Sequence, residues 1–341
     1  METQYLQVQD LERDGPLLDR AAALLREGQL VAFPTETVYG LGGNALLPGA
    51  AKAIYAAKGR PSDNPLIVHI ASLQELPPLV REVPEALHRL AARFWPGPMT
   101  VVLPKSDWIP YETSGGLDTV AIRMPSHPVA RELIRRSGVP VAAPSANLSG
   151  SPSPTCAAHC VHDLDGRIAA IVDGGPCQVG VESTVLTLCG EPRVLRPGAV
   201  TLEMLRQVLP DIRYDPGVFH HLSDQAKVAS PGMKYKHYAP KTRVVLVRGD
   251  REQFRRFLLG RQGALGVLCF EGDLPGGRWP VLTYGREHDP ASQARQLFDA
   301  LRRVDGLGVP VVYARVCGEE GIGQAVYNRL LRAAGFEEIA L

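Results

Sequence analysis

The sequence has no long hydrophobic run, almost no net charge and few cysteines, and each of these features argues against one class of protein. Its apolar stretches, such as Leu30–Phe33 and Val141–Ala143, are far shorter than the roughly 20 residues of a membrane helix. The 37 basic and 36 acidic residues leave a formal charge of +1, so no overall polybasic signal points to nucleic acid or membrane. Six cysteines and a polar N-terminus without an apolar signal core predict a cytoplasmic protein with reduced thiols.

The 341 residues predict about two domains, because a domain typically has roughly 150 residues. Residues 1–208 alternate between helical and strand-like patterns, which predicts an α/β domain with a mixed sheet. Residues 209–242 are rich in proline and lack periodicity, which indicates a functional loop or a linker. Residues 243–341 show a second, shorter pattern that predicts a small Rossmann-like α/β domain with a parallel sheet.

Hydrophobic periodicity places the elements of the first domain. The predicted strands are Leu30–Phe33, Leu66–Ile70, Thr100–Leu103, Thr119–Arg123, Val139–Ala143, Ala169–Val172 and Thr184–Leu188. The predicted helices are Leu17–Arg26, Ala50–Ala57, Glu85–Phe94, His127–Arg136 and Thr155–Asp163.

A segment rich in hydroxyl and glycine residues follows the first predicted strand. Residues 33–43 read FPTETVYGLGG, with Thr35 and Thr37 near the start. Glycines and small hydroxyls after a strand let backbone N–H groups approach a ligand. The segment is not a Walker loop, because the Gly-Lys-Ser/Thr ending is missing. A ligand-binding loop and a plain turn both remain possible.

Two cations, Lys58 and Arg60, lie at the end of a predicted helix and just before prolines. A guanidinium and an ammonium are a common combination on phosphates, but cations there also suit the helix dipole. His69 follows on a predicted strand, where a lone histidine is more often a core residue than a ligand. These residues alone do not separate a phosphate site from a helix cap.

Arg123 interrupts an otherwise apolar strand, so it must pair with a buried carboxylate or face a cavity that holds a substrate carboxylate. Ser145 and Asn147 follow another strand, and they suit contacts to phosphate or ribose or a polar turn. Ser183 and Arg196 also lie near strand ends. The group Cys156, His159, Cys160 and His162 lacks the convergent spacing of a zinc site and indicates a helix surface.

The sequence shows no Ser-His-Asp set, no catalytic cysteine signature and no isolated pair of acidic residues. The candidate positions are basic, hydroxylic and rich in glycine. This composition predicts a site that binds and aligns charged groups without a covalent nucleophile.

Seven motifs occur in an order that resembles the YrdC-type threonylcarbamoyl-AMP synthases. They are PTETVYGL (34–41), KGR (58–60), NPLIVH (64–69), WPGPMT (95–100), RMP (123–125), PSAN (144–147) and EST (182–184). Residues 230–240 and 321–329 resemble the long two-domain form, so the resemblance covers nearly the whole chain.

The resemblance implies a twisted mixed sheet with a concave basic face. It implies a nucleotidyltransferase that condenses L-threonine, bicarbonate and ATP into threonylcarbamoyl-AMP with release of pyrophosphate. This is the first step of N6-threonylcarbamoyladenosine modification of tRNA. Mg²⁺ is expected as a cofactor carried mainly by the ATP phosphates, with no metal-binding residues of the protein. A tRNA-modifying transferase complex, or tRNA itself, would be a weak partner, and no membrane partner is implied.

The resemblance also implies roles for individual residues. Lys58 and Arg60 would be catalytic, since they would offset charge on the leaving pyrophosphate; replacing either should abolish adenylate formation and leave the fold intact. The threonine and carbamate pocket would comprise Thr35, Thr37, His69, Arg123 and Ser183. The nucleotide would contact Lys58, Arg60, Asn64, Thr119, Ser145, Asn147, Arg196 and Tyr235. Independently of the resemblance, the length, the aromatic and basic content and the lack of periodicity of residues 209–242 predict a lid that excludes water.

Two other functions compete with this one. A module that binds RNA without chemistry fits poorly with the near-zero net charge. A carbamoyltransferase of hydrogenase maturation would carry acylphosphatase-like and zinc-finger regions, which this sequence lacks.

Overall fold

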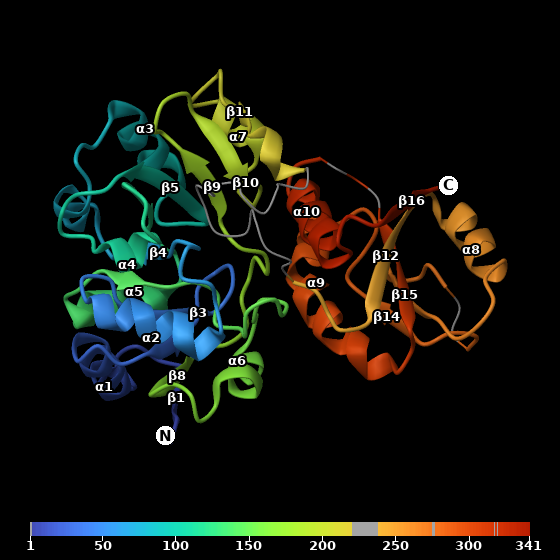
Figure 1. The fold of residues 1–341 in the computed structure, drawn as a ribbon, viewed down its shortest axis with the longest axis horizontal. Helices are drawn as coiled ribbons and strands as arrows, with labels where there is room; N and C mark the ends of the chain where they lie inside the picture. Colours follow the sequence, from blue (N-terminus) through green and yellow to red (C-terminus); the bar gives the residue numbers. More distant parts are fainter. Residues whose placement is uncertain (1, 220–237, 275–276, 317, 319) are drawn as a thin grey trace. The chain divides into compact units, whose positions relative to one another are not determined.

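The computed structural model describes residues 2–219, 238–274, 277–316, 318 and 320–341, which form two compact units (Figure 1). The first unit comprises residues 2–149, 153–178 and 182–219. The second comprises 150–152, 179–181 and the described residues from 238 onward. None of the helices in these ranges is long and apolar enough to cross a membrane. The predicted α/β class, with a mixed sheet and a smaller parallel one, is confirmed.

The first unit is built on an 11-stranded mixed sheet. In spatial order its strands are β1 (Gln4–Gln7), β8 (Ala170–Asp173), β2 (Val31–Phe33), β3 (Gly40–Asn44), β7 (Val141–Ala142), β4 (Ile67–His69), β6 (Thr119–Arg123), β5 (Met99–Pro104), β9 (Thr184–Thr187), β10 (Arg193–Arg196) and β11 (Arg213–Tyr214). β4 and β6 run parallel, whereas β5 and β7 run antiparallel to their neighbours β6 and β4.

Helices cover the sheet unevenly. They are α1 (Gly15–Arg26), α2 (Pro48–Lys58), α3 (Glu85–Phe94), α4 (Tyr111–Ser114), α5 (Pro128–Ser137), α6 (Ala157–Leu164) and α7 (Leu202–Arg206). One core joins α2, α3 and α6 to the sheet through residues such as Ile54, Leu90 and Val68. A second core joins α1 and α5 to the β1–β7 half of the other face through residues such as Leu18 and Leu133.

The remaining half of that other face carries the candidate site. Successive strand residues point to opposite faces, so Val68 and Ile122 enter the first core while their neighbours face the opposite way. A small cluster of Ile67, Val102, Ala121, Val185 and Leu195 lies there, and all five residues come from strands. Side chains near these strand ends can therefore face a ligand.

β3 was not predicted as a strand, because its sequence is GLGGN and glycine is depleted in strands. It pairs with β2 and β7 in the centre of the sheet, and its residues are buried. A Cβ atom on Gly42 would lie 2.8 Å from the Phe33 ring. Glycine is therefore needed for close packing at a position where the sequence suggested a loop.

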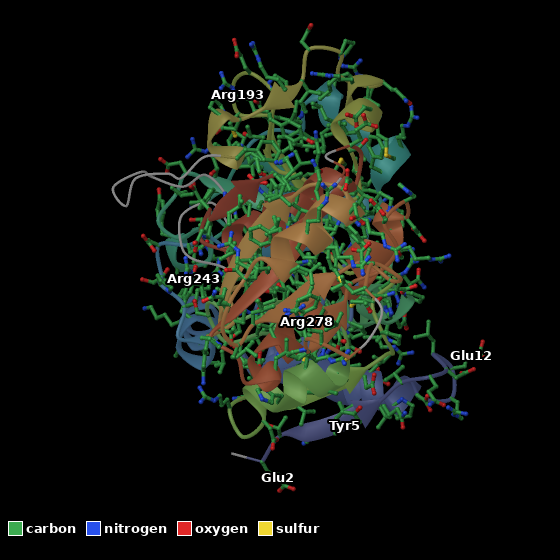
Figure 2. All side chains as sticks on the ribbon, turned by 90° about the vertical axis from the view of Figure 1, so that its right-hand side faces the viewer. Glu2, Tyr5, Glu12, Arg193, Arg243 and Arg278 are labelled. Carbon is green, nitrogen blue, oxygen red and sulfur yellow. The ribbon has the colours of Figure 1, made fainter. Side chains whose placement is uncertain are left out.

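The two edge strands of this sheet are polar, so hydrophobic periodicity in the sequence did not indicate them. β1 begins the sheet, and its Tyr5 (labelled in Figure 2) is 53% exposed and donates a hydrogen bond to Asp173. At the other edge, β11 pairs with β10 beyond the predicted domain boundary at residue 208. The sheet of the first unit thus extends into the segment that was predicted to be a linker or lid.

The second unit is a five-stranded sheet in which every recorded pairing is parallel. Its strand order is β14 (Val281–Thr283), β13 (Gly266–Cys269), β15 (Val311–Val316), β12 (Arg243–Arg248) and β16 (Glu338–Ala340). Helix α8 (Arg251–Leu259) covers one face, and α9 (Pro290–Arg303) and α10 (Gly323–Ala333) cover the other (Figure 1).

A buried ion network lies at the carboxyl edge of this sheet. Arg315, which is 1% exposed, contacts Asp273 at 2.6 Å and also pairs with Glu287. Ligands of open α/β sheets bind at such edges. Here the Arg315 guanidinium forms ion pairs with the carboxylates of Asp273 and Glu287.

Candidate active site

Two of the sequence motifs meet at adjacent strand ends. The backbone N–H of Leu41 donates to the Pro144 carbonyl, and that of Ala146 donates to the Tyr39 carbonyl, both at 2.8 Å. These bonds extend the pairing of β3 and β7 past the strand ends. The loop at residues 34–39 therefore lies beside the loop at residues 144–147.

Lys58 ends helix α2 and is 2% exposed. Its ammonium donates to the carbonyl of Ser145 at 2.5 Å and to the carbonyl of Asn147. The backbone adds a third link, because Ser149 N–H donates to the Lys58 carbonyl at 2.8 Å. Lys58 thus places a positive charge beneath the 144–147 loop and also fixes its conformation.

Arg60 follows Gly59, a C-cap with φ of 61° that lets the chain leave the helix. Its guanidinium donates to the carbonyls of Asn64 at 3.4 Å and Pro65 at 3.3 Å. Arg60 is half-buried. Asn64 is buried, and its carbonyl accepts a second bond from Tyr55 at 3.2 Å.

His69 and Arg123 are register partners on β4 and β6, so their side chains lie side by side on the helix-poor part of the sheet. Burial and the Arg123 charge lower the pKa of His69 to about 3, which keeps the imidazole neutral. His69 Nδ1 lies 3.1 Å from the Ile67 carbonyl. Thr100 on β5 pairs with Arg123 from the other side.

Glu36 is a site residue that the sequence did not single out. Its carboxylate lies 2.8 Å from Arg123 Nη2, and the two side chains are 6% and 5% exposed. A buried carboxylate was one of the two partners expected for Arg123, and the structure supplies it. Glu36 is part of the 34–41 motif, but nothing in its spacing from other residues indicated that it would pair with Arg123.

The two threonines of this loop have different environments. Thr35 Oγ1 donates to the Val38 carbonyl at 2.6 Å and accepts from the N–H groups of Thr37 and Val38, both at 3.2 Å. Since Thr35 has one hydroxyl proton, the hydrogen bond between the two hydroxyls must be donated by Thr37. Thr35 therefore shapes the turn, and Thr37 presents acceptor lone pairs.

Ser183 lies in a chain of hydrogen bonds. Its hydroxyl is 2.7 Å from Thr100 Oγ1 and accepts from Arg196 Nη2 at 3.2 Å. Arg196 also donates to the Ser183 carbonyl at 3.1 Å. A Cβ on Gly198 would lie 2.3 Å from Thr184 N, so glycine permits the close approach of the two segments. Thr100 was not predicted, because a buried strand threonine carries no sequence signal.

Two of the predicted site residues lie at opposite ends of β6. Arg123 lies at its carboxyl end, and Thr119 lies at its start and is half-buried. The four residue steps from Thr119 to Arg123 span roughly 13 Å along the strand. In the 144–147 loop, Ser145 donates to the Asn147 side chain at 2.5 Å, and this hydrogen bond orders that loop. A single amino acid is too short to span this distance, whereas an amino acid joined to a nucleotide is long enough.

Tyr235 lies outside the described residues, as do positions 220–234 of the expected lid. Among the residues that are described, no group of three or more His, Cys, Asp or Glu side chains could hold a metal ion. Cys160 was expected on a helix surface, but it is buried in the core, so that expectation is wrong for this residue. His159 Nδ1 accepts from Thr155 N–H at 3.2 Å.

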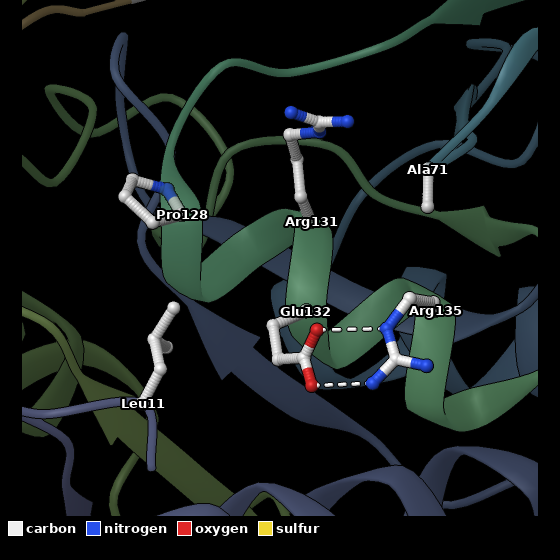
Figure 3. A pocket seen from close by; sticks show the side chains of 6 residues that line it. All are labelled: Leu11, Ala71, Pro128, Arg131, Glu132 and Arg135. Carbon is white, nitrogen blue, oxygen red and sulfur yellow. Dashed lines mark hydrogen bonds and ion pairs between the residues drawn. The ribbon is translucent and has the colours of Figure 1, made fainter.

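A cavity of about 300 Å³ lies elsewhere on the first unit (Figure 3). In it, Glu132 accepts two bonds from Arg135, at 2.6 and 2.8 Å, and Arg131 points away from that pair. None of the predicted site residues lines it.

The chain is similar to known proteins over nearly its whole length. A family model described as "Telomere recombination" matches residues 23–198. A second, described as "Threonylcarbamoyl-AMP synthase, C-terminal domain", matches residues 200–335.

Two curated relatives match nearly the full chain, and both are named threonylcarbamoyl-AMP synthase. The protein of Pyrococcus abyssi is 49% identical over 330 residues, which cover 94% of each chain. That of Bacillus subtilis is 49% identical over 333 residues, which cover 96% of this chain and 95% of the relative. A crystal structure described as P. abyssi Sua5 complexed with L-threonine superposes with a TM-score of 0.91 at 46% identity, covering 100% of both chains.

Proposed function

Because this chain belongs to the family of two-domain, Sua5-type threonylcarbamoyl-AMP synthases, we propose that its first unit condenses L-threonine, bicarbonate and ATP and releases pyrophosphate. The activity is the synthesis of threonylcarbamoyl-AMP, the first step of threonylcarbamoyladenosine modification of tRNA. The observation that carries the substrate assignment is Arg123, a buried cation at a strand end. It lies beside a neutral histidine on β4 and pairs in register with Thr100 on β5.

The threonine end of the site is proposed to lie at Arg123. Its guanidinium binds the α-carboxylate, since Arg is suited to bidentate recognition of a carboxylate. Neutral His69 and the hydroxyls of Thr37 and Ser183 line the pocket. These groups can form hydrogen bonds without adding charge, and Thr37 does so as an acceptor because its proton is donated to Thr35.

The nucleotide end is proposed to lie near Lys58 and the 144–147 loop. The buried ammonium raises the positive potential where the loop would receive phosphates. Half-buried Arg60 offsets the charge that builds on pyrophosphate as it leaves. The other proposed nucleotide contacts are Asn64, Thr119, Ser145, Asn147, Arg196 and Tyr235.

The reaction needs two bond-forming steps. The threonine amine attacks bicarbonate carbon and water leaves, which gives the carbamate. A carbamate oxygen then attacks the α-phosphorus, and the bond to pyrophosphate breaks. This chain's contribution is alignment: Arg123 holds the threonine carboxylate while Arg60 and the 144–147 loop hold the phosphates. Mg²⁺ would be carried by the phosphates, as a charge-neutralising ion on the leaving group.

A transferase complex that modifies tRNA is the proposed consumer of the product. The adenylate is a reactive acyl phosphate, so its prompt transfer would limit hydrolysis. Direct contact with tRNA is proposed as weak, since the chain has a formal charge of only +1.

Pyrophosphate release with each substrate omitted in turn tests the function. All three of ATP, L-threonine and bicarbonate should be required, and other amino acids should support little release. Release without threonine, or equal release with any amino acid, would contradict the assignment.

A further inference from the structure

The ion pair of Glu36 and Arg123 leaves hydrogen-bonding capacity unused. The closest approach is 2.8 Å between Arg123 Nη2 and Glu36 Oε1, yet the groups are not aligned for a hydrogen bond. Among the described residues, neither Glu36 oxygen has a hydrogen-bond partner, and the same holds for Arg123 Nε and Nη2. His127 Nδ1, close to this pair, is also buried without one.

Such a cluster is costly for a protein without a ligand. Buried polar atoms are nearly always hydrogen-bonded, because leaving one unpaired costs the free energy of removing it from water. A buried ion pair compensates for its desolvation only when its remaining lone pairs and protons are satisfied. The arrangement therefore indicates that a ligand supplies the missing partners.

The charges define which ligand fits. Arg123 offers N–H donors and Glu36 offers carboxylate acceptors, at neighbouring points of one buried site. An α-amino acid carries a carboxylate and an ammonium on the same carbon. The carboxylate is complementary in charge to Arg123, and the ammonium is complementary in charge to Glu36. We propose that Glu36 binds the α-ammonium group of threonine while Arg123 binds its carboxylate. This inference rests on the proposed function, and it adds the residue that recognises the reacting nitrogen.

The neighbours of Glu36 do not compete for this role. Burial lowers the pKa of His127, an effect that the Glu36 charge only partly opposes, so the imidazole is neutral at physiological pH. Burial likewise raises the pKa of the Cys177 thiol, with a further contribution from Glu36. Neither side chain brings a positive charge. The Glu36 charge is thus left for Arg123 and the ligand.

The local structure holds Glu36 in place before the ligand arrives. The hydroxyl of Thr35 accepts from two backbone N–H groups of the same turn, both at 3.2 Å. A Cβ on Gly174 would lie 2.8 Å from Pro34 and 3.2 Å from His127, so the neighbouring turn packs tightly on the loop. A preorganised carboxylate binds an ammonium without an ordering cost.

The test compares two ligands on the wild-type protein, on Glu36→Gln and on a control variant by calorimetric titration. The ligands are L-threonine and 2,3-dihydroxybutanoate, which replaces the amine by a hydroxyl and keeps the carboxylate. In Glu36→Gln, threonine affinity should fall about ten- to hundred-fold, the usual effect of losing a charge-assisted hydrogen bond. Affinity for the dihydroxy acid should stay within about threefold. Glu132→Gln, which alters an ion-paired carboxylate on α5, should leave both affinities unchanged.

Equal losses for both ligands, or no loss for threonine, would overturn the role of Glu36. A wild-type protein that does not bind threonine would overturn the proposed function as well, which separates the two failures. If Glu36→Gln does not fold, Glu36→Asp replaces it in the same comparison. Aspartate keeps the charge at shorter reach, so it should retain a preference for threonine; loss of that preference would contradict the proposal.

Discussion

Replacing Lys58 with methionine should destabilise the first unit as well as stop adenylate formation. The sequence suggested a phosphate contact whose loss leaves the fold intact. The structure shows the ammonium bonded to the carbonyls of Ser145 and Asn147 while it is 2% exposed. Methionine keeps the aliphatic packing and removes both donors, so two loop carbonyls lose their partner.

The size of the effect follows from those two bonds. A hydrogen bond to a charged group contributes roughly 1.5–3 kcal/mol, so the pair gives a loss of about 3 kcal/mol or more. For a unit of about 200 residues, each kcal/mol shifts Tm by roughly 2–4 °C. We expect Tm of the first unit to fall by about 6–12 °C. The 144–147 loop should also become more accessible to hydrogen exchange.

Thermal unfolding and ATP binding should be measured on the same samples. Lys52→Met is the matched control, since Lys52 lies on the same helix but is 68% exposed and pairs with Glu112 at the surface. Such a pair contributes about 0–1 kcal/mol, so its Tm should change little. If Lys58→Met melts like this control and fails only to bind ATP, then Lys58 acts on phosphate alone and the loop-anchoring account is refuted.

Three further predictions follow from the same geometry. Arg60→Ala should reduce pyrophosphate release at least tenfold with a Tm change of only about 1–2 °C, because its hydrogen bonds to the Asn64 and Pro65 carbonyls are long; a large Tm loss would contradict this. Thr35→Val should cost about 1–2 kcal/mol of unfolding free energy by removing turn bonds, whereas Thr37→Val should mainly weaken threonine binding in calorimetry. The pKa of His69 is about 3 in the folded protein and 6.5 in the unfolded chain, so protons bind the unfolded chain preferentially below pH 6.5. Stability should fall by up to about 1.4 kcal/mol per pH unit from pH 6.5 toward 3, and His69→Gln should flatten that slope in denaturant titrations.

Strands that are apolar and regular were predictable from the sequence. Thr119–Arg123 has the predicted bounds, because Val120 and Ile122 enter a core while Ala121 between them faces the other side of the sheet. β3 was missed because its glycines are required by the Phe33 ring, a tertiary contact. β1 and β11 were missed because edge strands face solvent and need no apolar pattern.

The site residues also divide into those that the sequence could indicate and those that it could not. Arg123 could be singled out, because a charge in an apolar strand is a physical anomaly. Its partner Glu36 could not be assigned, since the pairing depends on a loop from another part of the sheet. Lys58 was recognised as important, but its bonds to loop carbonyls depend on the contact between α2 and residues 145–147.

The most direct test of the account follows the carbon of bicarbonate into the product. The wild-type protein is incubated with ATP, L-threonine and ¹³C-bicarbonate, and the adenylate is analysed by mass spectrometry. We predict threonylcarbamoyl-AMP that is one mass unit heavier than the product from unlabelled bicarbonate, and no such product from Arg123→Gln. An adenylate without the label, or a labelled product of unchanged yield in Arg123→Gln, would contradict the account.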